Sequence, residues 1–279
     1  MTQPHRLPPV VVTGATGMLG SATAIAVAER GASTLLVVRN PAKGQRLLDS
    51  LPTGGGSHHR MVVGDLAEPN SVRDIAEQIR AQNDDVAALI HTAAALFKDR
   101  QANSAGHEAM FATNVLARFL LTHELAQQLA AGSGGRSIYA TGPSPDRLDF
   151  DDLMAEASFN AFRQFRATNT ANLQLALQMA QRMEGTTVTS NAYHPGALQS
   201  DLMAGMPAMV RLITVPFGRS AMKAAQALAD LAVGEHHTAT NGKFYKRDKP
   251  APPPKATLDT DSRAQLWATC ARLLGVAPY

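Results

Sequence analysis

Short apolar runs alternate with longer, helix-like segments along most of this 279-residue chain. Such alternation leaves few choices of fold, because it is typical of parallel strands whose crossover helices cover both faces of one sheet. The expected strands are residues 10–12, 35–38, 60–63, 86–91, 137–140 and 186–193, and the expected helices are residues 18–30, a segment from 42, 71–82, 108–130, 159–183 and 262–274. The prediction is an α/β fold with a doubly wound parallel sheet of the Rossmann type, in a single domain over residues 1–279.

Composition narrows the classes of function. Hydrophobic residues make up 45% of the chain and charged residues 18%, which suits a globular domain with a sizeable core. No window of about 18 apolar residues is present, so no membrane partner is expected. The polar residues 1–9 lack a secretory pattern and the single Cys270 cannot form an internal disulfide, so a cytoplasmic location is expected. A net charge of +3 is too small to indicate a nucleic-acid partner, and the choice between monomer and homo-oligomer stays open.

A glycine-rich segment joins the first expected strand to the first expected helix. It reads Thr13-Gly14-Ala15-Thr16-Gly17-Met18-Leu19-Gly20. Glycines at this spacing let the backbone turn tightly and approach a pyrophosphate, whose charge lies at the helix N-terminus. A plain tight turn is the alternative, but the place at the first strand–helix junction favours a dinucleotide site. Its predicted contacts are Thr13, Gly14, Thr16, Gly17, Met18, Leu19 and Gly20.

The residues after the second expected strand, Arg39-Asn40-Pro41-Ala42-Lys43, indicate which dinucleotide is bound. An NAD site normally has an acidic residue here, which holds the ribose 2′-hydroxyl. Arg39 and Lys43 would instead attract the 2′-phosphate of NADP, and Arg can bind a phosphate through a planar fork. Two exposed basic residues without a ligand are the alternative. We predict NADP(H) as the cofactor, with Arg39, Asn40 and Lys43 beside its phosphate.

Further motifs follow in a fixed order. They are Gly64-Asp65-Leu66, His91-Thr92-Ala93-Ala94, Phe111-Ala112-Thr113-Asn114-Val115 and His194-Pro195-Gly196 with Ser200-Asp201-Leu202. In this order the chain resembles the short-chain dehydrogenase/reductase superfamily over nearly its whole length, most closely the branch of retinol dehydrogenases and protochlorophyllide reductases. The resemblance implies that Asp65 and Leu66 lie beside the adenine. It also implies cofactor contacts for Thr92, Ala93, Ala94, Asn114, Pro195, Gly196 and Ser200.

The residues at the family's catalytic positions differ from its pattern. The resemblance implies a Ser after the fifth strand and a Tyr-x-x-x-Lys motif on the following helix. This chain has Gly142 at the Ser position, Phe165 at the Tyr position and Asn169 at the Lys position. The conventional proton donor is therefore missing from this alignment. Thr141 and Ser144 offer hydroxyl groups that are either catalytic or structural, and Asn169 is expected to bind the nicotinamide ribose.

Three functions are compatible with this loss. One is an NADPH-dependent ketoreductase whose substrate carries a hydroxyl beside its ketone and supplies its own proton. Here the chain resembles the tyrosine-less ketoreductases of antibiotic polyketide pathways, of the angucyclinone (simocyclinone) kind, which implies a bulky, hydroxylated aromatic substrate. The second is a reductase of an imine or activated alkene. The third is a catalytically degenerate, NADP-binding regulator or cyclase-like protein.

An apolar, Met-rich segment spans residues 202–217. Because Met adapts to irregular surfaces, this segment is predicted to be a lid over the substrate, and an oligomer interface is the alternative. The expected substrate contacts are Phe165, Leu202, Met203 and Met206. The cofactor half would then be residues 8–142, and the catalytic and substrate half residues 143–279.

The histidines are expected to be structural or solvated. His194 precedes Pro195-Gly196, where a packing role is expected. His58, His59, His236 and His237 fall in expected surface turns, and no metal-ligand spacing links them to acidic residues. No metal site is predicted.

Overall fold

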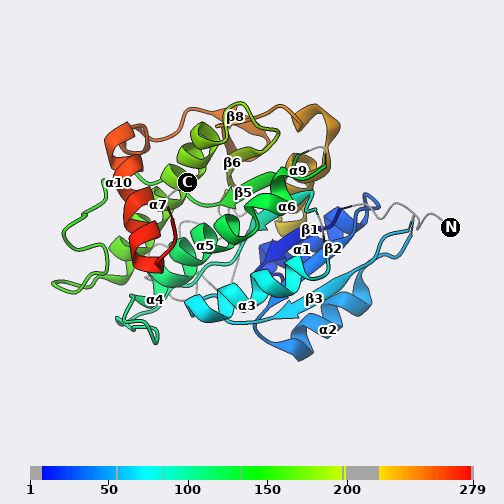
Figure 1. The fold of residues 1–279 in the computed structure, drawn as a ribbon, viewed down its shortest axis with the longest axis horizontal. Coiled ribbons are helices and arrows are strands. Elements are labelled where there is room, and N and C mark those ends of the chain that lie inside the picture. Colours follow the sequence, from blue (N-terminus) through cyan, green and yellow to red (C-terminus); the bar gives the residue numbers. More distant parts are fainter. Residues whose placement is uncertain are drawn as a thin grey trace.

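The computed structural model describes residues 8–54, 56–83, 85–132, 134–196, 198 and 220–277. Eight strands in this part of the chain form one sheet, in the order β3-β2-β1-β4-β5-β6-β7-β8 (Figure 1). All pairings are parallel except that of β7 with β8. The strands are β1 (Val10–Thr13), β2 (Thr34–Val38), β3 (Arg60–Val63), β4 (Ala88–His91), β5 (Arg136–Ala140), β6 (Thr189–His194), β7 (Phe244–Lys246) and β8 (Lys249–Ala251). The predicted doubly wound α/β fold is confirmed.

Helices connect the strands and cover the sheet. The α-helices are α1 (Met18–Ala28), α2 (Pro41–Ser50), α3 (Pro69–Arg80), α4 (Ala109–Phe111), α5 (Ala117–Glu124), α6 (Ala126–Ala130), α7 (Ala161–Arg182), α9 (Ala221–Val233) and α10 (Thr260–Leu274). A π-helical segment, η1 (Ala112–Leu116), joins α4 to α5, and the short 3₁₀ turns are η4 (Glu235–His237) and η5 (Lys255–Thr257). Helix α9 and the hairpin of β7 and β8 were not among the expected elements.

Two hydrophobic cores lie on opposite faces of the sheet. Successive side chains of a strand point to opposite faces. In β2, Leu35 and Val37 belong to the core that α3, α5, α7 and α10 cover, whereas Leu36 and Val38 belong to the core that α1 and α9 cover. The strands are buried on both faces because helices cover both, which is why they appear in the sequence as unbroken apolar runs.

The segment expected as one helix over residues 108–130 is divided in the structure. Buried Glu108 caps its start, because its carboxylate accepts hydrogen bonds from the backbone N–H groups of Met110 and Phe111, both at 2.8 Å. The next turns widen into η1, where buried Asn114 exchanges two hydrogen bonds with the backbone of Ala95, at 2.7 and 2.9 Å. Such π-helical turns are frequent at functional sites. The interruption therefore directs Asn114 towards the loop after β4.

The strand order reverses between β1 and β4. The chain runs outward from β1 through β2 to β3 and then returns to β4 on the other side of β1. In open α/β sheets, ligands bind outside the carboxyl ends of the strands at such a point. Thr13, the last residue of β1, pairs with His91, the last residue of β4. The glycine-rich segment and the Thr92-Ala93-Ala94 turn therefore begin side by side.

Candidate active site

The glycine-rich segment and the turn after β4 approach each other too closely for side chains. Gly14 has a φ of +63°, and a Cβ added to it would lie 2.6 Å from the Ala93 Cα. A Cβ added to Gly20 would lie 2.3 Å from the Gly14 carbonyl oxygen and 2.8 Å from the Thr92 Oγ1. Gly17 precedes α1, and no side chain caps the start of this helix. The two turns therefore pack in backbone contact, and the exposed Gly17 leaves an opening at the start of α1 where no side chain caps the backbone N–H groups, as a pyrophosphate requires.

Hydrogen bonds fix this opening to the ends of β1 and β4. The Thr92 hydroxyl donates to the Thr13 carbonyl at 2.6 Å, and the Ala93 N–H donates to the Thr13 Oγ1 at 3.4 Å. Asn114 holds Ala95, two residues further along the same turn. Beside these residues, a gap too small to hold a water molecule is lined by Thr13, Leu66, His91, Ala93, Thr113, Ala117, Arg118 and Leu121. The structure therefore brings together the residues expected at the centre of the dinucleotide.

Arg39, Asn40 and Lys43 follow β2 and are all exposed. The Asn40 side chain caps α2 by accepting from the Lys43 N–H at 3.0 Å, so a structural contact already uses it. The Ala15 N–H donates to the Val37 carbonyl at 3.3 Å, which ties the glycine-rich segment to the end of β2. The two cations thus lie one strand away from the pyrophosphate position, where the adenine ribose of a dinucleotide extends. Asp65, after β3, accepts from the Ala67 N–H at 2.9 Å.

Gly142 and Asn169 are direct neighbours. The Asn169 Oδ1 accepts from the Gly142 N–H at 3.2 Å and from the Thr141 hydroxyl at 3.1 Å. A Cβ added to Gly142 would lie 3.2 Å from the Asn169 Nδ2. Phe165 lies one turn before Asn169 on α7 and is half-buried. The positions that the alignment assigns to the family's Ser and Lys therefore meet in space, with an amide between them.

Two further candidates have structural partners. Ser144 is completely buried, and its Oγ accepts from the Asp146 N–H at 3.3 Å. Asp146 in turn contacts Arg166 of α7 at 2.6 Å. The Nδ1 of His194, at the end of β6, lies 3.3 Å from the Thr141 carbonyl oxygen. Burial lowers the pKa of His194 to about 4, so its imidazole is neutral at neutral pH and lacks the proton of a cationic acid.

The loop after β6 is described only in part. Pro195 follows His194, and Gly196 has a φ of +90°, which only glycine adopts readily. Ser200, Leu202, Met203 and Met206, together with the predicted lid over 202–217, lie outside the described residues.

A Tyr-x-x-x-Lys spacing does occur elsewhere in the chain, at Tyr245 and Lys249. It falls in the antiparallel hairpin of β7 and β8 instead of on a helix. Tyr245 belongs to the hydrophobic core on the α9 side of the sheet, whereas α7, with Phe165 and Asn169, covers the other side. These two residues therefore do not restore the motif.

Arg118 is a site residue that sequence reasoning missed. It is 3% exposed, and its guanidinium donates to the Ala93 carbonyl at 2.6 Å and to the Ala140 carbonyl at 2.8 Å, linking the ends of β4 and β5. Burial lowers the pKa of Arg118 to about 10, so it stays protonated at neutral pH. Burial, and then this charge, lower the pKa of nearby His91 well below its ordinary value. The available signal was a lone charge in the apolar run Val115-Leu116-Ala117-Arg118-Phe119-Leu120-Leu121, one turn after Asn114.

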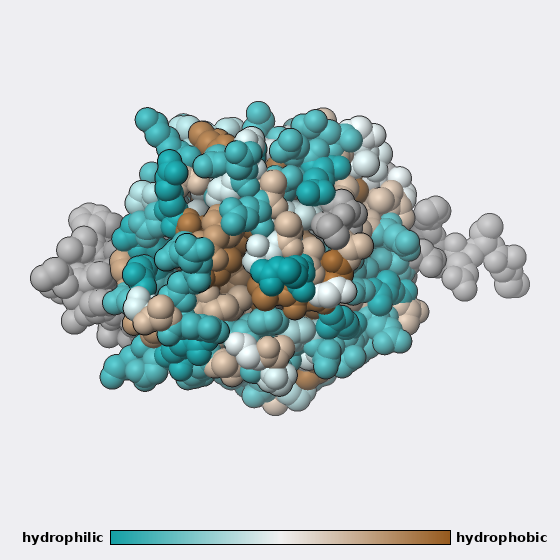
Figure 2. All heavy atoms as spheres, turned by 60° about the vertical axis from the view of Figure 1, so that its left-hand side comes forward, coloured by the Kyte–Doolittle hydropathy of each residue, from teal (hydrophilic) through white to brown (hydrophobic). Residues whose placement is uncertain are grey.

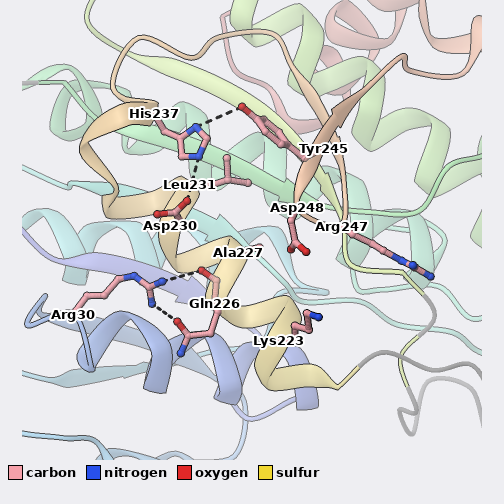
Figure 3. A pocket seen from close by; sticks show the side chains of 10 residues that line it. All are labelled: Arg30, Lys223, Gln226, Ala227, Asp230, Leu231, His237, Tyr245, Arg247 and Asp248. Carbon is pink, nitrogen blue, oxygen red and sulfur yellow. Dashed lines mark hydrogen bonds and ion pairs between the residues drawn. The ribbon is translucent and has the colours of Figure 1, made fainter.

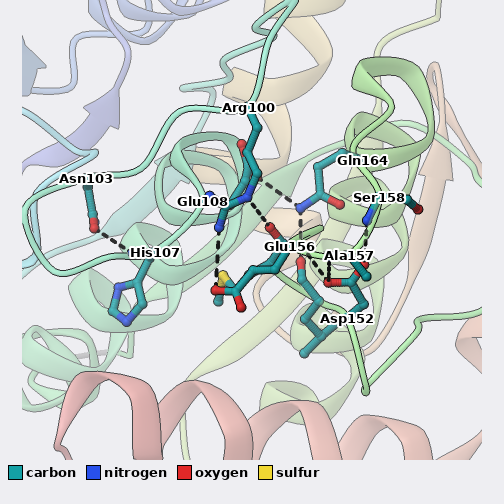
Figure 4. Close-up of polar contacts among 11 residues, drawn as sticks. Arg100, Asn103, His107, Glu108, Asp152, Glu156, Ala157, Ser158 and Gln164 are labelled. Carbon is teal, nitrogen blue, oxygen red and sulfur yellow. Dashed lines mark hydrogen bonds and ion pairs between the residues drawn. The ribbon is translucent and has the colours of Figure 1, made fainter.

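A buried polar contact fixes the start of α7. The Gln164 Nε2 donates to the Glu108 carboxylate and to the Leu153 carbonyl, both at 3.0 Å (Figure 4). Asp152 orders the preceding loop by accepting from the Glu156 N–H at 2.6 Å. Since Gln164 adjoins Phe165, these contacts hold the half-buried ring and the Asn169 one turn later in place.

Apolar surface is exposed beside this region. Phe162, on the first turn of α7, is 37% exposed. In the space-filling view, which brings the left-hand side of Figure 1 forward, apolar residues gather near the middle, surrounded by hydrophilic ones (Figure 2).

No helix within the described part of the chain is both long and apolar enough to cross a membrane.

Comparison with known proteins shows relatives along the whole chain. A family profile described as short chain dehydrogenase matches residues 9–210. A Streptomyces sp. protein named "Putative daunorubicin C-13 ketoreductase DnrU" is 30% identical over 269 residues, which cover 95% of this chain and 92% of that protein. Human retinol dehydrogenase 13 is 29% identical over 279 residues, covering 96% and 84% of the two chains.

Solved structures share the fold. A crystal structure of an uncharacterized protein from Mycobacterium paratuberculosis superposes with a TM-score of 0.78 at 22% identity, covering 98% of this chain and 97% of the other. A short chain dehydrogenase from Burkholderia cenocepacia, solved in complex with NADP, gives a TM-score of 0.68 at 21% identity, covering 88% and 98%. By its sequence match, its strand order and its glycine-lined opening, the chain belongs to the short chain dehydrogenase family of NAD(P)-dependent oxidoreductases.

Proposed function

We propose that this protein is an NADPH-dependent ketoreductase of a hydroxylated aromatic polyketide or a similar secondary metabolite. The observation that carries the proposal is the contact between Gly142 and Asn169. The resemblance assigns these two positions and Phe165 to the family's proton-donating residues, while the glycines expected at the dinucleotide are kept. A protein that binds NADPH but has no proton-donating side chain at the reacting carbonyl suits a substrate whose own hydroxyl group donates the proton. The name of the Streptomyces relative, a daunorubicin ketoreductase, points the same way.

The described residues fit the cofactor. Gly14, Gly17 and Gly20 would receive the pyrophosphate, and Arg39 and Lys43 would hold the 2′-phosphate. Bound NADPH would supply the hydride for the substrate carbonyl. We assign the cofactor to residues 8–142 and the substrate to residues 143–279, with Ser200, Leu202, Met203 and Met206 retained as proposed contacts.

The protein's own contribution is orientation and water exclusion. Arg118 fixes the ends of β4 and β5 relative to each other, and Asn169 fixes Gly142 and Thr141. The Phe165 ring cannot donate a proton, but it can exclude water from the reacting carbonyl. A hydroxyl hydrogen-bonded to that carbonyl within the substrate would then transfer its proton as the alkoxide forms. Holding the reactants in such a geometry is itself a large part of catalysis.

The proposal is tested with a substrate panel. Oxidation of NADPH is followed with aromatic ketones that carry a neighbouring phenol, and with retinal, imines and activated alkenes for comparison. We expect turnover with the phenolic ketones. Turnover confined to the imines or alkenes would show the second predicted function instead. NADPH binding without any turnover would favour the degenerate regulator or cyclase.

Cofactor preference rests on Arg39. The Arg39→Asp substitution should abolish the preference for NADPH over NADH, because it removes a charged phosphate contact and adds repulsion. A hydrogen bond to a charged group is worth about 1.5–3 kcal/mol, or roughly 10–150-fold in affinity. Dissociation constants for both cofactors are measured by fluorescence titration. Arg46→Asp, which makes the same charge change one turn after Lys43 on α2, is the matched control. Equal constants for the two cofactors in the unmodified protein would refute the assignment.

A further inference from the structure

Two histidines and an aspartate meet at the C-terminal end of α9, on the α1 side of the sheet. The helix ends at Val233, and the 3₁₀ turn η4 follows directly. The Gly234 N–H donates to the Asp230 carbonyl at 2.7 Å, which starts a chain reversal. This reversal brings the His236 Nε2 to 3.1 Å and the His237 Nε2 to 3.4 Å from the Asp230 Oδ2. His236 and His237, six and seven positions after Asp230, thus come close to its carboxylate. Their spacing in the sequence did not predict this contact.

The distances between these groups match those between metal ligands. One ligand atom from each of Asp230, His236 and His237 lies within 4.8 Å of the others. Bonds of about 2.0–2.2 Å in a tetrahedron place ligand atoms roughly 3.3–3.6 Å apart, so the two observed His–Asp distances need little adjustment. Two imidazoles and one carboxylate are a ligand set that zinc and its neighbours in the first transition row accept. Among the described residues, Asp230, His236 and His237 are the one group of three or more His, Cys, Asp or Glu side chains whose ligand atoms lie close enough to hold a metal ion.

A second layer of contacts orients His237. Its Nδ1 lies 3.5 Å from the Tyr245 hydroxyl oxygen of β7 (Figure 3) and 3.5 Å from the Thr240 Oγ1. With the Nε2 on a metal, the Nδ1–H would donate to one of these oxygens. Metal-ligating histidines almost always have such a partner, which fixes the tautomer and the ring orientation. The exposed His236 ring lies beside it, with the ring centroids 4.1 Å apart.

The backbone beneath the cluster is held from within the protein. The buried Arg136 of β5 donates to the Leu231 carbonyl at 3.1 Å and to the Gly234 carbonyl at 2.9 Å, so the end of α9 is anchored to the sheet. Asp230 and His237 also line a hollow of about 340 Å³ beside α9 and β7, and the His236 side chain is exposed. The ligands are therefore both positioned and accessible.

We propose that Asp230, His236 and His237 bind one divalent late transition-metal ion, Zn²⁺ foremost, with water completing the coordination. Bound there, the ion would link the end of α9 to strand β7 through His237 and Tyr245. The site lies apart from the glycine-lined opening and from Gly142, Phe165 and Asn169. The proposal is therefore independent of the proposed reaction.

The test is a Zn²⁺ titration of protein without a histidine tag, against a chromogenic chelator as competitor. We expect saturable binding of one Zn²⁺ per chain, and no competition by Mg²⁺, which prefers oxygen ligands. His236→Ala, His237→Ala and Asp230→Asn should each weaken binding by more than about tenfold, since even outer-shell partners are worth about 10–100-fold in affinity. His58→Ala, which removes an exposed histidine outside the cluster, should leave the affinity unchanged.

Thermal unfolding provides a second measurement. Zn²⁺ should raise the unfolding midpoint of the unmodified protein and of His58→Ala, but not that of His236→Ala, because a ligand of the native state stabilises it by linkage. The His236 side chain is 67% exposed, so its removal should leave the apo-protein folded. Equal Zn²⁺ affinity in His58→Ala and the three cluster variants, or no saturable binding by the unmodified protein, would overturn the proposal.

Discussion

The methyl ether of a phenolic ketone substrate should bind this protein and remain unreduced. If the substrate's own hydroxyl donates the proton, methylation removes the donor while leaving the ring system almost unchanged. The loss of general-acid assistance is worth about 10²–10⁴-fold in rate. Binding is measured by competition with the free phenol, and turnover by NADPH oxidation. Reduction of the ether at a rate near that of the phenol would show that the proton comes from water or from the protein.

Side-chain variants supply the matching control. Thr141→Ala, Ser144→Ala and Asn169→Ala should each lower the rate with the phenol by much less than 10²–10⁴-fold, because these side chains orient the site without donating the proton. Ser144 and Asn169 already have structural hydrogen-bond partners, so their variants need a check of thermal stability. Phe165→Tyr should not raise the rate greatly, since Asn169 remains at the position that the resemblance assigns to the family's lysine. A loss of about 10³-fold in any of the alanine variants would identify that residue as the donor instead.

Gly20→Ala should reduce NADPH affinity by about 100-fold or more, which corresponds to about 2.7 kcal/mol. Within a helix, replacing Gly by Ala is ordinarily stabilising by about 1 kcal/mol. Here the added Cβ would lie 2.3 Å from the Gly14 carbonyl oxygen, so the backbone of the opening must shift. Fluorescence titration with NADPH measures the loss. Gly54→Ala is the matched control, because no atom lies within 4 Å of the Cβ that it adds. Unchanged affinity in Gly20→Ala would mean that the pyrophosphate binds elsewhere.

Local pattern predicted the elements that form the centre of the sheet. The first five expected strands all occur, within about two residues of their expected bounds, because an apolar run between turn residues has few alternatives. Helix α9 was missed although its buried residues Ala224, Leu228 and Leu231 recur at helical spacing, so the sequence does carry a signal for it. Strands β7 and β8 have three residues each and exist through pairing with β6 and with each other. Strands this short show no clear alternation, and the pairing of β7 with β6 joins segments that lie far apart in the sequence.

The candidate site also contains residues that the sequence predicted and residues that it did not. The place of Gly14, Gly17 and Gly20 followed from sequence order, and the resemblance to a family predicted the support that Asn114 gives to the turn after β4. The buried contacts of Arg118 depend on carbonyl groups 22 and 25 residues away, and these become neighbours only when β4 and β5 pair. The metal-ligand cluster depends on the chain reversal at Gly234.

The contact between Asn169 and Gly142 also bears on how such a site could evolve. A serine at position 142 alone would crowd the Asn169 amide, whose Nδ2 would lie 3.2 Å from the new Cβ. A lysine at position 169 alone would remove the acceptor that now serves the Gly142 N–H and the Thr141 hydroxyl. Each reversion is thus unfavourable in the absence of the other, and neither gains an acid until position 165 changes too. This coupling is epistasis, because the effect of a substitution at any one of the three positions depends on the residues at the other two.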